Sequence, residues 1–148
     1  MPEINDILFT SAAHGFAGHC LMAVTRIGRH AIHCQLWSPD GVITYPATPD
    51  TFTVCGRLPL ETRDPVEAYT RRRHSLTASV GDVILTELTG NHPLNHCLMV
   101  VAERDANSLL AWMRTPEREY PLRAQPGEYI LCGRLTQDDL DALLQRAA

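Results

Sequence analysis

The feature of this chain that most constrains its fold is an internal duplication. His-Cys-Leu-Met occurs at 19–22 and again at 96–99, and Cys-Gly-Arg-Leu occurs at 55–58 and again at 132–135. Each second copy follows its first by the same 77 residues, and twelve of the forty ungapped positions between 19 and 58 carry identical residues in the second copy. Self-similarity at a fixed offset predicts one structural unit formed twice.

Each copy is expected to consist mainly of short strands. Apolar runs rich in β-branched residues are separated by turn residues such as Gly90-Asn91-His92-Pro93, a pattern that indicates short strands joined by tight connections. The expected strands are 6–10, 20–25, 31–37, 41–45 and 51–55 in the first copy, and 82–88, 96–102, 108–113 and 128–131 in the second.

A short helix is expected after each Cys-Gly-Arg-Leu. Asp64 stands before Pro65, a favoured first helical residue, and Thr136 with Asp139 three residues later resembles a capping box. The predicted fold class is therefore mainly β with two short helices. Two repeats, 1–70 and 78–148, are expected to pack about a pseudo-two-fold axis as one compact domain, a small barrel or curled sheet.

Composition excludes several classes of protein. The 148 residues carry a net charge of −4, so no overall basic field attracts nucleic acid. No apolar run is long enough to span a membrane, and the first residues lack the pattern of a signal peptide. Five cysteines, an odd number without a Cys-x-x-Cys pair, indicate reduced thiols and a cytoplasmic location.

The second copy resembles the barrel of LexA-type self-cleaving repressors and their signal-peptidase relatives. The resemblance rests on HSLTASVGDVIL at 74–85, NHCLMVV at 95–101, LLAWMRTPEREYP at 109–121 and YILCGRL at 129–135, and in the first copy on AVTRI at 23–27. It implies a β-barrel duplicated in tandem. In that family a serine nucleophile is activated by a lysine kept neutral by burial.

The chain departs from this family at the catalytic residues. Ser75 is the nearest match to the serine but lies two residues too close to Gly81-Asp82, and the lysine position falls on Thr25 or Ala102. All 13 basic residues are arginine, which cannot serve as a neutral base. The composition therefore excludes serine–lysine hydrolysis.

The repeated cysteines and histidines allow three interpretations. A zinc site could combine His19, Cys20 and Cys55 with their mates His96, Cys97 and Cys132, but adjacent residues on a strand point to opposite faces. The Gly-Asp strand followed by a histidine-bearing strand also resembles NlpC-type cysteine hydrolases, with His96 as the base. The third interpretation, buried cysteines that pack equivalent strands, is favoured because a fold needs its core in both halves. We expect no metal and no cofactor.

These observations predict a non-catalytic, LexA-like binding module with a regulatory role, which pairs with a protein partner or with itself as a dimer. The expected binding residues are Arg71, Arg72, Arg73, Trp37 and Trp112. Nucleic-acid binding is a further option, which rests on the arginine run alone. The alternative is a small hydrolase that uses His96 or His19 with Cys97 or Cys20.

One prediction follows from the missing lysine. Incubation of the purified protein at raised pH should give no self-cleavage between residues 71 and 80, because no neutral amine can take the proton of Ser75. Intact-mass measurement checks this. A clean break in this segment that Ser75→Ala abolishes would contradict the non-catalytic interpretation.

Overall fold

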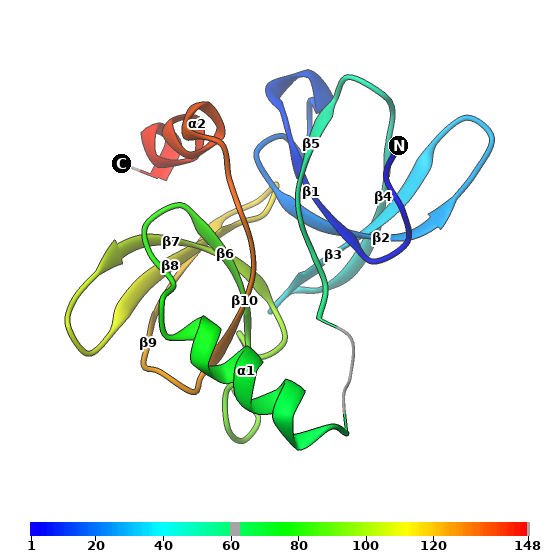
Figure 1. Cartoon of the computed structure of the whole chain (residues 1–148). Coiled ribbons are helices and arrows are strands. Elements are labelled where there is room, and N and C mark those ends of the chain that lie inside the picture. The colour runs from blue at the N-terminus through cyan, green and yellow to red at the C-terminus, as the bar shows by residue number, and fades with distance from the viewer. Residues whose placement is uncertain (60–62, 148) are drawn as a thin grey trace.

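The protein forms ten antiparallel strands and two helices, which a computed structural model describes for residues 1–59 and 63–147 (Figure 1). The first half contains β1 (Asp6–Thr10), the 3-10 turn η1 (Ala12–His14), β2 (Leu21–Ile27), β3 (Ile32–Ser38), β4 (Gly41–Ala47) and β5 (Phe52–Arg57). Helix α1 (Pro65–Ser75) follows. The second half contains β6 (Asp82–Thr86), β7 (Leu98–Arg104), β8 (Leu109–Arg114), β9 (Glu119–Ala124), β10 (Tyr129–Arg134) and α2 (Gln137–Ala147).

The strand order has the same topology in both halves. The single sheet runs β4-β3-β2-β1-β5-β10-β6-β7-β8-β9, so that β5 and β10 meet at its centre and β4 and β9 form its edges. Register shifts also recur at equivalent places, between Val24 and Arg26 in β2 and between Val101 and Glu103 in β7. This agreement supports the internal duplication that the sequence predicts.

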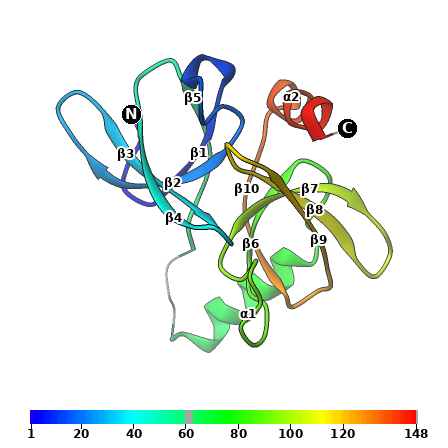
Figure 2. The ribbon, with the colours of Figure 1, turned by 180° about the vertical axis from the view of Figure 1, so that it is seen from behind.

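Of the two expected architectures, a small barrel and a curled sheet, the barrel does not form. In each half the five strands curl around their own core, but the outer strand does not return to close the sheet. The strand that would have to complete the closure in the first half, β5, instead pairs with β10 of the second half. The result is one open, continuous sheet in two curled halves (Figures 1 and 2).

The two halves meet where two glycines face each other. Gly56 of β5 pairs with Gly133 of β10. A Cβ atom on Gly133 would lie 2.6 Å from the Cα of Gly56 and still closer to the carbonyl oxygen of Cys55, and a Cβ on Gly56 would collide with Cys132 and Gly133 in the same way. The repeated Cys-Gly-Arg-Leu is therefore explained by a close approach of two backbones that only glycine permits.

The residues after each glycine tie β5 and β10 to the first strand of their own half. Arg57 pairs with Asp6 at 3.0 Å and Arg134 pairs with Asp82 at 2.6 Å. The next N–H, from Leu58, donates to the carbonyl of Asn5, and Leu135 N–H donates in the same way to Gly81.

These contacts also align the first strands of the two halves. Asp6 corresponds to Asp82, an offset of 76 rather than 77, so Ile7 is equivalent to Val83 and not to Ile84. The extra residue of the second copy lies in its longer connection between Thr86 and His96. The gapless offset of 77 applies only from His19 onward.

Three groups of buried side chains form the core. Each half has its own cluster, centred on Leu8, Met22 and Leu36 in the first half and on Ile84, Met99 and Leu109 in the second. The third cluster joins the halves and includes α2. Its members are Ile7, Phe9, Leu21, Ala23, Cys55, Val83, Leu98, Val100, Leu135, Leu140 and Leu143.

Both expected helices are present, but they pack differently. The Asp64 carboxylate accepts from Val66 N–H and Thr136 Oγ1 accepts from Asp139 N–H, which confirms both expected caps. Helix α2 buries Leu140 and Leu143 against the shared core, whereas α1 buries only Ser75 and lies along β10. Helix α1 also continues to Ser75, so the expected boundary at 70–78 cuts through it.

The described part of the chain contains no helix that is long and apolar enough to cross a membrane.

The glycine contact at the centre of the sheet predicts a large effect of a single methyl group. Gly133→Ala should lower the free energy of unfolding by at least about 3 kcal/mol, because the new Cβ meets rigid backbone on the opposite strand. Chemical denaturation measures this. Gly28→Ala is the control, since its Cβ would lie 3.1 Å from the nearest atom, the Ala31 carbonyl oxygen in a hairpin turn, and it should cost much less. Equal losses in the two variants would contradict the special role of Gly133.

Candidate functional site

The repeated histidines occupy the same strained backbone position. His19 and His96 have φ of 60° and 55°, in the left-handed region, where histidine is one of the more tolerated residues besides glycine. Each histidine N–H donates to the carbonyl of a strand threonine, His19 to Thr10 and His96 to Thr86. These histidines therefore form the turn that enters β2 or β7.

The cysteines that follow them face the interior. The Cys20 and Cys97 side chains are buried, and each thiol donates back to its own turn, to Gly18 and Asn95. The N–H groups of both cysteines donate to the hydroxyl of the same strand threonines, Thr10 and Thr86. The repeated His-Cys pair thus serves a turn held by a buried threonine.

Burial holds the thiols in their neutral form. It raises the pKa of Cys55 and of Cys132 to about 12, and that of Cys34 and of Cys97 to about 11. A nucleophilic cysteine needs the opposite shift, towards a thiolate at neutral pH. This environment opposes the hydrolase interpretation that pairs His96 with Cys97.

Ser75, the nearest match to a serine nucleophile, has a structural role. Its hydroxyl donates to the carbonyl of Arg71 at 2.9 Å and accepts from Leu131 N–H at 3.1 Å. It therefore links the last turn of α1 to β10, and no lysine stands beside it because the chain contains none.

A cleft of about 1230 Å³ runs along α1. In Figure 1, α1 lies across the lower part of β10 and β6. The cleft is lined by Pro59, Arg63, Ala68, Tyr69, Arg71, Arg72, Arg73, Leu76, Leu85, Glu87, His96, Pro126, Gly127, Tyr129 and Ile130. The expected binding residues Arg71, Arg72 and Arg73 all belong to it.

The cleft is basic although the protein as a whole is acidic. Among the described residues, four arginines and one histidine line it, against one carboxylate, that of Glu87. Arg71 is half-buried and lies 3.6 Å from Glu67 one helical turn away. Arg72 and Arg73 are exposed, and no carboxylate of the described residues lies within ion-pair distance of either.

A second, smaller hollow of about 400 Å³ adjoins the first and contains Trp37. Leu85 and His96 line both hollows, so the two hollows lie side by side. The Trp37 indole is half-buried between the halves and its Nε1–H donates to Gln35 at 3.1 Å. Trp112 lies elsewhere, on β8 opposite Val100 and Pro121, and lines neither hollow.

No group of three or more histidine, cysteine or carboxylate side chains converges on a point among the residues that the structure describes. The zinc set considered from the sequence is not brought together, because His19 and His96 start strands of different halves and the cysteines face three different core clusters.

Comparison with models of protein families, with curated proteins and with solved structures gave no match. The resemblance to LexA-type and NlpC-type proteins therefore stays a prediction from the sequence.

Several cleft residues gave no signal in the sequence. Tyr69, Leu76 and Tyr129 look like ordinary apolar residues of a helix and a strand, and only the packing of α1 on β10 brings them to one hollow. The one available signal was the position of Tyr69 one helical turn before Arg72 and Arg73, which places an aromatic ring beside the basic run.

The raised thiol pKa values predict low reactivity in the folded state. At neutral pH a thiol-specific disulfide reagent should react slowly with the native protein and rapidly with all five cysteines in concentrated guanidinium. Cys132, the least buried, should react first. A single thiol that reacts at once in the native protein would show that at least one cysteine is not held neutral by burial.

The same shifts set the dependence of stability on pH. Because the folded-state pKa of these thiols is raised above 9.0, their contribution to stability is complete below pH 9.0 and is lost as the pH rises towards 12.

Proposed function

We propose that this protein is a non-catalytic binding module whose cleft along α1 receives an acidic, partly apolar segment of another protein. The observation that carries the proposal is the gathering of four arginines around an apolar floor in a chain of net charge −4.

The arginines supply the charge recognition. Arg72 and Arg73 present exposed guanidinium groups, which bind carboxylates through paired, charge-assisted hydrogen bonds. Arg71 is already held by its ion pair with Glu67. It therefore adds positive charge to the cleft but does not offer a free set of hydrogen-bond donors. An acidic side chain on the partner complements this arrangement.

The floor of the cleft supplies apolar contact. Tyr69 of α1 is 58% exposed, and Leu76, which follows the last residue of α1, is 49% exposed, although α1 packs on β10. Leu85, Tyr129 and Ile130 extend the same surface. An apolar side chain that covers this surface gains the free energy of its burial, about 25 cal/mol per Å² of apolar area.

A protein segment suits this site better than nucleic acid. The net charge of −4 repels a long polyanion, whose binding draws on many phosphate contacts spread along an extended basic surface. The basic groups here are confined to one helix and its neighbours and surround an apolar hollow.

The alternative, a hydrolase based on His96 and Cys97, finds less support. The Cys97 thiol is buried, bonded to the Asn95 carbonyl and held neutral, while the His96 side chain is exposed. The chain has no lysine, so the serine–lysine chemistry of LexA-type proteins is also excluded, which supports a binding role without catalysis.

Peptide binding tests the proposal. Fluorescence polarisation would compare labelled peptides in which Asp or Glu alternates with Leu or Phe against peptides with Asn or Gln in place of the acids. We expect the acidic peptides to bind more tightly, and Arg72→Glu with Arg73→Glu to weaken that binding at least about tenfold.

The matched control is Arg26→Glu with Arg29→Glu, which makes the same change in net charge on the exposed β2–β3 hairpin and should leave binding unchanged. Equal losses in both double variants, or tighter binding of a single-stranded oligonucleotide that depends on Arg72 and Arg73, would overturn the proposal.

A further inference from the structure

The two edges of the sheet are equivalent in the duplicated fold but differ in chemistry. β4 (Gly41–Ala47) ends the sheet on one side and β9 (Glu119–Ala124) ends it on the other. An edge strand presents unpaired backbone N–H and C=O groups on its outer side, which other chains can pair with unless they are blocked.

The positions whose backbone groups point outward can be identified from the prolines. A proline has no N–H to give to the neighbouring strand, so Pro46 in β4 and Pro121 in β9 occupy outward positions. Backbone groups that point outward and inward alternate along a strand. The N–H and C=O groups of Val42 and Thr44 in β4, and of Glu119 and Arg123 in β9, therefore also point outward. The two sets are equivalent across the offset of 77 residues: 42 with 119, 44 with 121, and 46 with 123.

The edge of β9 is blocked and the edge of β4 is open. Pro121 removes the central outward donor of β9, between two charged residues, Glu119 and Arg123. β4 has threonine at the position of Pro121 and carries no charged residue from 41 to 47. The duplicated unit thus carries an edge-protecting pattern in one copy and lacks it in the other.

The free part of the β4 edge is short and well defined. At one end the carbonyl of Pro46 contacts His14 Nε2 at 2.7 Å, and at the other end Asp40 N–H donates to Ser38 Oγ at 3.2 Å. Between them, Val42 and Thr44 keep outward N–H and C=O groups, with no strand of the described chain beyond them.

We propose that β4 pairs with β4 of a second copy of this chain, antiparallel and symmetric about Ile43. In this register Val42 of one copy lies opposite Thr44 of the other, and the two pairs form four hydrogen bonds. A register centred on Val42 would require the N–H of Asp40, which is already bonded, and one centred on Thr44 would require Pro46, which has no N–H.

The side chains favour self-pairing. Val42 is 60% exposed and Ile43 is 42% exposed on opposite faces of β4, so pairing covers apolar surface on both faces. Two copies of Ile43 would meet at the symmetry axis. The uncharged strand brings no like charges together, which is the usual obstacle to pairing a strand with itself.

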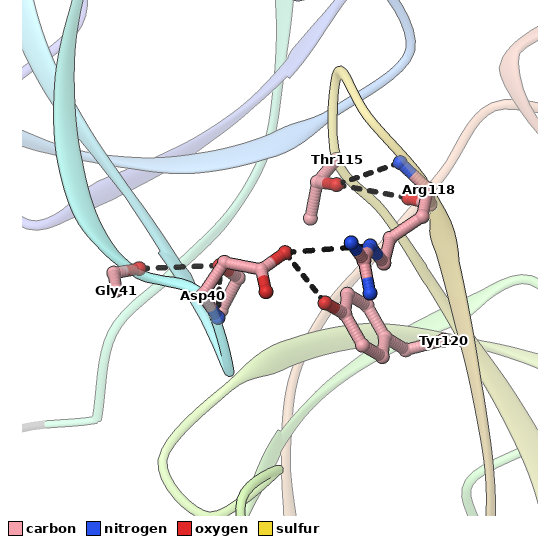
Figure 3. A network of polar contacts seen from close by, with 6 residues as sticks. Asp40, Gly41, Thr115, Arg118 and Tyr120 are labelled. Carbon is pink, nitrogen blue, oxygen red and sulfur yellow. Dashed lines mark hydrogen bonds and ion pairs between the residues drawn. The ribbon is translucent and has the colours of Figure 1, made fainter.

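The nearest charge, at Asp40, is already engaged within the molecule. Its carboxylate accepts from the hydroxyl of Tyr120 at 2.6 Å and lies 3.6 Å from the guanidinium of Arg118, as Figure 3 shows. This hydrogen bond raises the pKa of Tyr120. The contact also fixes the first end of β4 against the second half, so that the strand is held in place before a partner arrives.

The association state tests the proposal. Sedimentation velocity over a wide concentration range should show a monomer–dimer equilibrium for the natural chain. Thr44→Pro removes one outward N–H per copy and should raise the dimer dissociation constant at least about tenfold. Thr44→Val keeps the N–H and should dimerise like the natural chain. The proline at the equivalent position 121 shows that the fold accommodates this change.

The register has its own test. Ile43→Cys should form a disulfide between copies under mild oxidation, because residues facing each other at a non-hydrogen-bonded position have Cα atoms about 4.5 Å apart, within the range that a disulfide spans. Val42→Cys lies opposite Thr44 and should cross-link far less.

Two results would overturn the proposal: a chain that stays monomeric at all concentrations, or a dimer whose dissociation constant Thr44→Pro leaves unchanged. Should Thr44→Pro prevent folding, as judged by circular dichroism, Val42→Glu copies the residue found in β9 and replaces it in the same comparison. A dimer that cross-links through Val42→Cys but not Ile43→Cys would reject the register.

Discussion

The contact between the backbones of Gly56 and Gly133 is the constraint on which the rest of the structure depends. It joins two curled sheets into one, and it brings the inner faces of both halves together over a shared core that neither half could cover alone. The other residues of the repeated motif serve the same junction. Each arginine forms an ion pair with the first strand of its own half, and the N–H of the next residue donates a hydrogen bond to the residue just before that strand. The motif is therefore a structural signature, and its recurrence reflects a symmetric joint.

The interesting surfaces lie where the symmetry fails. Helix α2 is tightly packed and completes the shared core, whereas α1 is attached through Ser75 and leaves Tyr69 and Leu76 in contact with solvent. The edge strands differ in a similar way. A duplicated protein that needed only to fold could keep its two halves alike, so the departures from equivalence are the natural places to look for binding.

The sequence was informative about everything that is local. The caps at Asp64 and Thr136, the repeated turns and the packing role of the cysteines follow from neighbouring residues and are seen in the structure. Closure of the sheet was not predictable, because β5 pairs with β1 along one edge, and whether its other edge pairs within its own half or with β10 depends on a contact 77 residues away. Strand β9 was missed because Pro121 argues against a strand, and only its place at the edge makes the proline harmless. The offset between the halves changes from 76 at the first strands to 77 at His19, because one residue is added in a connection whose length no local pattern fixes. The cleft was only half foreseen: the arginines were visible, but the hollow beside them arises from the way a helix lies on a sheet.

The palindromic order of the sheet has a consequence for how the chain is made. The first half has all five of its strands before residue 82 has been synthesised, and its pairings are complete except along β5, whose only remaining neighbour is the last strand of the chain. Gly56 must therefore wait for Gly133, and at typical translation rates of about 5–20 residues per second that interval is on the order of 4–15 seconds. During this time a nascent chain on the ribosome exposes the edge of β5 that will later pair with β10, although the other edge of β5 is already paired with β1. The first half is thus most open to wrong pairing while the second half is being synthesised.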